Sequence, residues 1–230
     1  MNKEADHLAV PDAVFHIWNN RWKIEIEAAH LFSNLAKDLF TYAGPDDPIG
    51  KMAERAASDE LRHAERCKEI LSQSPIPLKE LTPHISTQLG PVTDSIHERI
   101  LYAAVAVCCV TETLSTALLI DMQKKAEPGL ISNTIHEILV DEVKHSQIGW
   151  AQLARSSKET NVSWLTQYIP SMINEALRTD IRPMIGISNK QTDLSRWGIL
   201  PAHCAHAIMQ DTIVNVIQPG LKEFGIQVLA

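Results

Sequence analysis

Two short segments of this sequence combine a glutamate and a histidine at a spacing that can bind a metal ion. In Asp59-Glu60-Leu61-Arg62-His63 and Asp141-Glu142-Val143-Lys144-His145, the glutamate stands three residues before the histidine. About 3.6 residues complete one turn of an α-helix, so on a helix both side chains point in much the same direction. Each pair offers one divalent metal an anionic oxygen and a neutral nitrogen. One such pair is a common accident of helix composition, whereas two near-copies in one chain indicate a two-metal site.

Helices are the elements that must position these segments, because the sequence has no strand-forming alternation of useful length. Asp12 is predicted to cap the first helix, and Asp47 followed by Pro48 to begin the second. Thr93 or Asp94 is predicted to cap the third. Apolar periodicity with Pro and Gly breaks predicts helices at about 13–42, 48–72, 93–125, 130–156, 162–186 and 201–225.

The order of these helices predicts an all-α fold in one domain, residues 1–230. The Pro-rich connection 74–91 is long enough to carry the chain from one end of a bundle to the other. Two hairpins joined by one long crossover are the connectivity of a ferritin-like four-helix bundle. We expect this bundle within residues 10–157 and two additional C-terminal helices within 162–225. Pro183 is expected to end or kink the first of these two helices.

A helical wheel at ~100° per residue indicates which carboxylates face the predicted core. Glu60, Glu112 and Glu142 each lie in the middle of an apolar stripe of their own helix. A buried carboxylate is costly unless it is paired, protonated or bound to a metal. Three of them on three core stripes are therefore not typical of solvent-exposed helix faces.

The first helix offers two glutamates, and its apolar stripe favours Glu25. Glu25 lies about 60° from the centre of the stripe and Glu27 about 100° from it on the other side. Glu27 and His30 are therefore predicted on the surface. Arg21 falls on the stripe one turn before Glu25, either as a structural ion pair or as a partner for a site carboxylate. The predicted metal ligands are Glu25, Glu60, His63, Glu112, Glu142 and His145.

Further polar side chains lie near the predicted ligands along the same helices. Cys67, Tyr102 and Cys108 either line a cavity near the metals or simply pack in the core, and Tyr102 could also be redox-active. His203 and His206, on either side of Cys204 and Ala205, are the one other metal-like group. No carboxylate accompanies them at ligand spacing.

Composition excludes several other classes of protein. The formal net charge of −7 and a pI near 5.8 argue against nucleic acid or an anionic membrane as the main partner. The apolar run 100–110 is too short to span a bilayer, and residues 1–7 contain no apolar signal region, so no membrane span and a cytoplasmic location are expected. The four cysteines form no Cys-x-x-Cys pair, which argues against a disulfide framework or a zinc site.

On the duplicated Asp-Glu-x-x-His motif, the chain resembles the ferritin-like di-iron carboxylate superfamily over residues 10–157. Glu25, followed by Ala28 and Phe32, is also similar to the first ligand helix of that superfamily. In ligand order, spacing and length, the chain is most similar to the aldehyde-deformylating oxygenases. The cysteine site of rubrerythrins is missing, and Ile138 stands where arylamine N-oxygenases have an extra histidine.

The resemblance implies two iron ions as cofactor, with manganese or a mixed manganese–iron pair as alternatives. It implies dioxygen and a small organic substrate, and is compatible with an external electron donor and a homodimer. Asp59 and Asp141 are expected behind the ligands, because metal-bound imidazoles usually donate their other N–H to a carboxylate. The expected activity is that of a di-iron oxidase or monooxygenase with an apolar substrate pocket. Metal handling, peroxide detoxification and a non-catalytic interaction module remain as alternatives.

Overall fold

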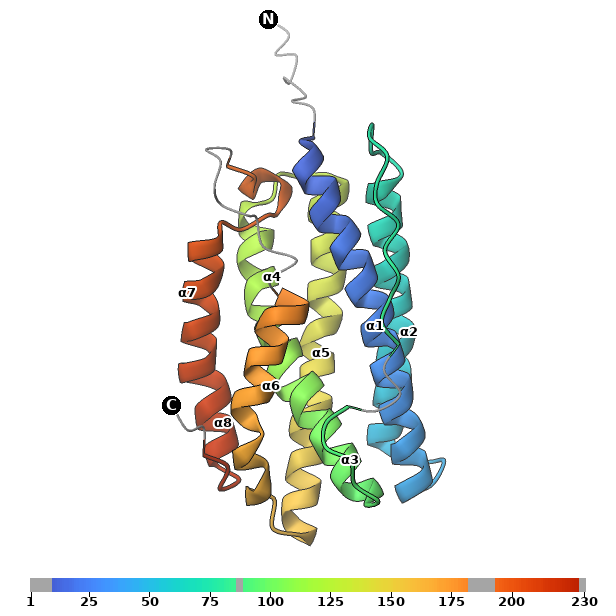
Figure 1. The fold of residues 1–230 in the computed structure, drawn as a ribbon, viewed down its shortest axis with the longest axis vertical. Helices are drawn as coiled ribbons and strands as arrows, with labels where there is room; N and C mark the ends of the chain where they lie inside the picture. The colour runs from blue at the N-terminus through green and yellow to red at the C-terminus, as the bar shows by residue number, and fades with distance from the viewer. Residues whose placement is uncertain (1–9, 86–88, 182–192, 228–230) are drawn as a thin grey trace, which may run out of the picture.

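The computed structural model describes residues 10–85, 89–181 and 193–227. Within these residues the regular structure is helical, as predicted. The longer helices run up and down along one common direction (Figure 1).

The first hairpin consists of α1 (Asp12–Ala43) and α2 (Pro48–Leu71). The predicted cap of α2 is confirmed, since the Asp47 carboxylate accepts a hydrogen bond from the Gly50 amide at 2.9 Å. The predicted cap of α1 is wrong: Asp12 is already within the first turn, and Pro11 precedes the helix without a side-chain cap. Proline is well tolerated at the start of a helix, because its fixed φ is compatible with the helical conformation.

A long connection follows α2 and runs back along the first hairpin toward the start of α3 (Figure 1). It has the course predicted for a crossover. The third predicted helix begins later than expected, because Ser95 and neither Thr93 nor Asp94 is the N-cap. The Ser95 hydroxyl accepts a hydrogen bond from the Glu98 amide at 3.3 Å.

The third predicted helix is also not uniform. It consists of α3 (Ile96–Ala103), the π-helix η1 (Ala104–Glu112) and α4 (Thr113–Lys125). Two threonine hydroxyls follow the wider turn by donating to carbonyls five residues earlier, Thr111 to Ala106 at 3.1 Å and Thr113 to Cys108 at 3.5 Å. A π-helical turn contains more residues than an α-helical turn, so a 3.6-residue wheel does not apply across this segment. The second hairpin is completed by α5 (Leu130–Glu159).

The C-terminal third covers the face formed by η1 and α4. Apolar side chains such as Leu165, Met172, Met209 and Ile217 share one core with Leu114 and Leu118 of α4. The two additional helices predicted here are in fact broken into shorter segments. Residues 182–192, including Pro183, lie outside the described residues. The segments are η2 (Ser163–Gln167), α6 (Ile169–Glu175), η3 (Ala176–Ile181), η5 (Ser195–Trp197), α7 (Ala202–Thr212), η6 (Ile213–Ile217) and α8 (Gln218–Lys222).

The apolar core divides into two parts along the first hairpin. In α1, Phe15 and Trp18 belong to one part, and Phe32 and Leu39 to the other. Glu25 lies between them in the chain. In α2 the apolar residues before and after the Glu-x-x-His pair likewise belong to different parts, whereas in α5 the residues after the pair belong to both, Ile148 to one and Leu153 to the other. The predicted metal ligands therefore occupy a polar layer with apolar packing on either side.

The continuous helical rod Ile96–Lys125 is long and apolar enough to cross a membrane by length and composition alone. It has 30 residues, a mean hydropathy of 1.9 in its most apolar window, and 67% of that window is buried inside the protein. Burial to this extent is what packing in a protein core produces, so the rod is accounted for without a membrane.

Gly149 of α5 is the point at which η1 approaches that helix most tightly. An added Cβ would lie 2.5 Å from the Ala104 carbonyl oxygen and 2.7 Å from the Cys109 sulfur. Such distances lie below normal van der Waals contact, and a backbone oxygen cannot turn away as a flexible side chain can. A residue without a side chain is therefore needed one helical turn after His145.

We expect Gly149→Ala to destabilise the fold even though alanine favours helices by about 1 kcal/mol over glycine. Overpacking a well-packed core costs about 1–3 kcal/mol, and the clash here is with backbone. Thermal unfolding should give a lower midpoint than wild type, while Gln147→Ala on the exposed side of α5 should leave it nearly unchanged. An unchanged or raised midpoint for Gly149→Ala would show that η1 and α5 are not in close contact.

Candidate metal centre

The six predicted ligands come together in the structure from α1, α2, η1 and α5. Their exposed fractions are between 0% and 4%. They form two groups of four, and the possible ligand atoms of each group lie within 4.8 Å of one another. Glu60 and Glu142 belong to both groups, so two carboxylates are shared. We call these residues the inner cluster: Glu25, Glu60, His63, Glu112, Glu142 and His145.

Both imidazoles turn Nδ1 toward the carboxylates. The Nδ1 atom of His63 lies 3.2 Å from Glu60 and 3.6 Å from Glu25. The Nδ1 atom of His145 lies 3.2 Å from Glu142 and 2.9 Å from Glu60. The two rings are 6.0 Å apart between centroids. Each histidine thus presents one nitrogen to the carboxylates of its own group.

The Nε2 atoms face the opposite way, toward the two aspartates, and the pairing crosses between helices. His63 of α2 faces Asp141 of α5 at 3.4 Å, and His145 of α5 faces Asp59 of α2 at the same distance. Each aspartate therefore contacts the imidazole of the other motif. Sequence reasoning expected carboxylates at this position but had no means to predict the crossing.

Arg62 and Lys144 neutralise these aspartates, and sequence analysis missed both. Arg62 donates to Asp59 at 2.7 Å and to Asp141 at 2.5 Å, joining α2 to α5. Lys144 donates to Asp141 at 2.8 Å. The signal was present, because each motif has a basic residue three positions after its aspartate, a spacing at which helix side chains meet.

Arg21 lies inside the inner cluster, which favours its interpretation as a partner for site carboxylates. It is 4% exposed, its Nε donates to Glu25, and its Nη2 lies 3.5 Å from Glu142. Burial by itself would lower the pKa of the guanidinium, but the two carboxylates outweigh that effect and raise it. Arg21 is thus a permanent buried positive charge against two of the predicted ligands.

Burial and neighbouring charges shift the pKa values of the inner carboxylates in different directions. Burial would raise the pKa of Glu25, but Arg21 and His63 reverse the shift and hold it well below its usual range. For Glu112, burial together with the charge of Glu142 raises the pKa well above 4.5. Burial and Glu142 also raise the pKa of Glu60, to about 7. Burial and the charge of Glu142 therefore favour the neutral form of Glu112 in the metal-free protein.

The pKa values of the two imidazoles shift in the opposite direction from the one that burial alone would cause. Burial lowers the pKa of His63, but its carboxylate neighbours Glu25 and Glu60 raise it to about 11. Glu142 and Glu60 do the same for His145, whose pKa is about 10. A metal ion binds only the deprotonated imidazole, so metal binding must displace these protons.

A cavity of about 60 Å³ adjoins the inner cluster. It is lined by Arg21 and all four inner carboxylates, and by the apolar residues Ile24, Ala28, Leu31 and Val107. A larger cavity of about 750 Å³ shares Glu27, Leu31, Val107 and Thr111 with the small one, so the two adjoin. Glu27, predicted on the surface, is only 18% exposed, because it lines both cavities and pairs with Lys23. His30 is exposed, as predicted.

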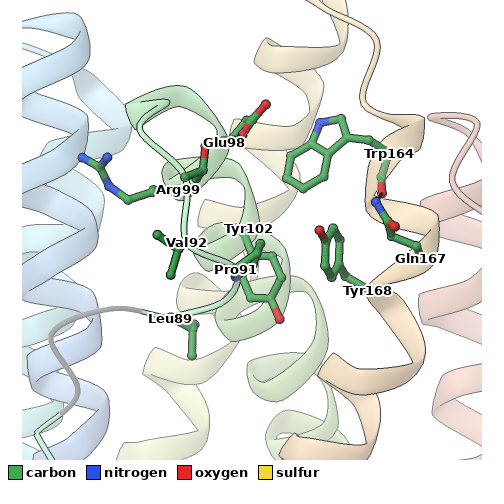
Figure 2. A pocket seen from close by; sticks show the side chains of 10 residues that line it. Leu89, Pro91, Val92, Glu98, Arg99, Tyr102, Trp164, Gln167 and Tyr168 are labelled. Atoms are coloured by element: carbon green, nitrogen blue, oxygen red, sulfur yellow. Dashed lines mark hydrogen bonds between the residues drawn. The ribbon is translucent and has the colours of Figure 1, made fainter.

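Tyr102 lies away from the inner cluster, between the larger cavity and a separate pocket of about 270 Å³. Figure 2 shows its ring and those of Tyr168 and Trp164 on one side of this pocket. Tyr102 meets Tyr168 edge-on, with ring centroids 5.6 Å apart. Tyr102 thus lines other cavities and is not among the residues that line the cavity beside the inner cluster, and its ring contacts that of Tyr168.

The cysteines pack in the core. Cys67 and Cys108 are fully buried, and burial raises the pKa of both thiols well above 9, so both stay protonated. Neither is among the residues that line the cavity beside the inner cluster. His203 and His206 are exposed, and within the described residues the metal-like groups are only the two that make up the inner cluster.

The crossed pairing makes a specific prediction for the aspartates. Asp141→Asn should weaken metal binding about 10–100-fold at the group containing His63, and Asp59→Asn at the group containing His145, because each removes the charge that orients an imidazole. Manganese(II) titrations followed by EPR measure this. In a His63→Ala background, Asp141→Asn should have no further effect, whereas Asp59→Asn should keep its effect. Asp46→Asn, at a 95% exposed side chain, is the control. The reverse pattern would contradict the crossed pairing.

The raised pKa values predict how the stability of the metal-free protein depends on pH. His63 and His145 are protonated in the fold up to about pH 11 and 10, against ~6.5 in the unfolded chain. A group with a raised pKa stabilises the fold at low pH, and this stability is lost as pH rises through the folded pKa. The thermal midpoint in EDTA should therefore fall between about pH 6.5 and 10.

The metal-loaded protein is the control for this experiment, because its imidazoles no longer hold those protons. Metal binding becomes tighter as pH rises. The difference in thermal midpoint between manganese-loaded and metal-free protein should therefore widen with pH over the same range. A metal-free midpoint that rises with pH would contradict the buried protonated histidines.

Comparison of this chain with protein-family models, with curated proteins and with solved structures finds no match.

Proposed function

We propose that this protein is an oxygen-activating di-iron oxidase or monooxygenase built on a ferritin-like four-helix bundle, and that it acts on a small organic substrate. The observation that carries this proposal is the inner cluster. Two groups of four ligands share Glu60 and Glu142 in a buried layer between apolar residues.

The donor atoms of the inner cluster fit two divalent ions. Four carboxylates and two imidazoles are the hard oxygen and nitrogen ligands that suit iron(II) or manganese(II). One side-chain oxygen supports the fit: Glu60 Oε1 is buried and makes no hydrogen bond, although His145 Nδ1 lies 2.9 Å away. In the metal-free protein the protonated imidazole of His145 offsets the charge of Glu60, and a metal ion held by both residues would replace that proton.

Glu25, Glu60, His63 and Glu142 would hold one ion, and Glu60, Glu112, Glu142 and His145 the other. When bound, two iron ions would supply the electrons that reduce dioxygen and so oxidise a substrate. Asp59 and Asp141 would fix the orientation of the imidazoles by accepting from Nε2. Arg62 and Lys144 would hold those aspartates in place from the outer side. The apolar packing on either side of the layer limits access of water to the reacting groups.

The cavities favour an organic substrate over iron or peroxide as the substrate. The space beside the inner cluster is lined on one side by apolar groups and adjoins a cavity of about 750 Å³. A protein that only stores iron or removes peroxide has no need for a partly apolar space of that size.

Metal stoichiometry tests the proposal most directly. Anaerobic reconstitution with iron(II) should give two ions per chain by elemental analysis, and Glu60→Gln or Glu142→Gln should lose at least one, since each removes a shared ligand. Glu65→Gln, on the exposed side of α2, should keep both ions. The reduced wild-type protein should then consume dioxygen faster than Glu60→Gln or Glu142→Gln. Fewer than one ion per chain, unchanged by Glu60→Gln, would support a non-catalytic module instead. A large iron load per assembled particle would support metal storage.

A further inference from the structure

Arg21 has a part of its guanidinium group without any partner. Its Nε and Nη2 face Glu25 and Glu142, whereas Nη1 is buried and has no hydrogen-bond partner among the described residues. A buried guanidinium N–H without an acceptor is costly. Arg21 lines the cavity of about 60 Å³ beside the inner cluster, so a ligand in that cavity could supply the acceptor.

The charges around the inner cluster also call for an anion. The four inner carboxylates would be balanced by two divalent metal ions, with the imidazoles neutral. In the outer layer, Asp59 and Asp141 are balanced by Arg62 and Lys144. The positive charge of Arg21 then remains without a counter-charge. Because burying an uncompensated charge is strongly unfavourable, a metal-loaded site favours one further negative ligand.

The shape of the space indicates what that anion is attached to. The small cavity has room for only a few heavy atoms, about the size of a carboxylate group. Leu31 and Val107, together with Glu27 and Thr111, line both this cavity and the larger one, so the two spaces adjoin and part of their boundary is apolar. In the larger cavity, Leu89, Ala106 and Met172 provide an apolar part of a wall that also carries Lys23, His84 and Arg178. A ligand with an anionic head and an apolar body fits both spaces together.

We propose that the substrate is an organic carboxylate whose carboxylate group binds Arg21 and whose apolar body lies past Leu31 and Val107 in the larger cavity. This inference rests on the proposed di-metal function and names the substrate class of that site. The planar guanidinium group suits a carboxylate, since its N–H groups can donate in pairs. Arg21 would thus position the substrate next to the metal ions.

Binding of hexanoate, with neutral 1-hexanol as a probe of equal length, tests this inference. Calorimetry on anaerobic manganese(II)-loaded protein should give at least tenfold tighter binding of hexanoate than of 1-hexanol. Arg21→Gln should remove that preference, and Arg21→Lys should restore part of it because lysine keeps the charge but not the paired donors. Arg55→Gln, at an exposed side chain of α2, should leave hexanoate affinity unchanged. Arg178→Gln tests whether the arginine of the larger cavity binds the carboxylate instead. Metal-free protein should bind hexanoate weakly, because Glu25 and Glu142 then occupy Arg21.

A second variant tests the apolar part of the boundary between the cavities without altering Arg21. Leu31→Phe should weaken hexanoate binding at least tenfold and leave acetate binding within about twofold, because acetate has no body to place past this boundary. Equal effects on both ligands would contradict the assigned direction of the apolar body.

The outcomes separate the two proposals. If wild type binds no manganese, the di-metal function fails. If wild type and Arg21→Gln both load two ions per chain and bind hexanoate equally well, the di-metal function stands and the role of Arg21 is wrong. If hexanoate bound the metal ions directly, the second result would be observed. If it bound Arg178, hexanoate affinity would be lost with Arg178→Gln.

Discussion

The burial of four carboxylates in one layer is the constraint on which this structure depends. Each would be costly to bury as an isolated charge. In the metal-free protein, the compensation comes from Arg21 and from the protonated imidazoles of His63 and His145, and burial raises the pKa of Glu112, which favours its neutral form. These protons and bound metal ions would be alternatives, since a metal can bind only where the proton has left. The fold therefore holds a charge distribution that protons complete in the metal-free protein and that metal ions could complete instead.

This constraint explains why much of the site could be predicted from sequence. Glu60, His63, Glu142 and His145 lie on regular α-helices, where a 3.6-residue period relates spacing to direction. Glu25 could be distinguished from Glu27 for the same reason. A helical wheel could not predict that Glu27 lines a cavity, because the shape of a cavity between helices depends on side chains from the other helices.

Glu112 was predicted correctly as a buried residue, although its helix does not have the assumed period. It ends the π-helix η1, and the hydrogen bonds of Thr111 and Thr113 follow the wider turn. Sequence offered no signal for this segment, since a run of alanine, valine and cysteine is equally compatible with an α-helix. The crossed pairing of Asp59 and Asp141 was also beyond sequence reasoning. It depends on how α2 and α5 lie side by side, and local spacing within either motif does not contain that information.

The two halves of the inner cluster are related by the repeated motif, but their surroundings differ. Glu25 has Arg21 one turn away on a regular helix, which lowers its pKa, whereas Glu112 ends a π-helix and has its pKa raised by burial and by Glu142. Two metal ions held by these halves would therefore experience different fields, with Arg21 beside Glu25 and the shared Glu142. A substrate anion bound by Arg21 would lie in the cavity that all four inner carboxylates line. The repeated motif alone would make two equivalent sites, and the residues outside the motif make them unequal.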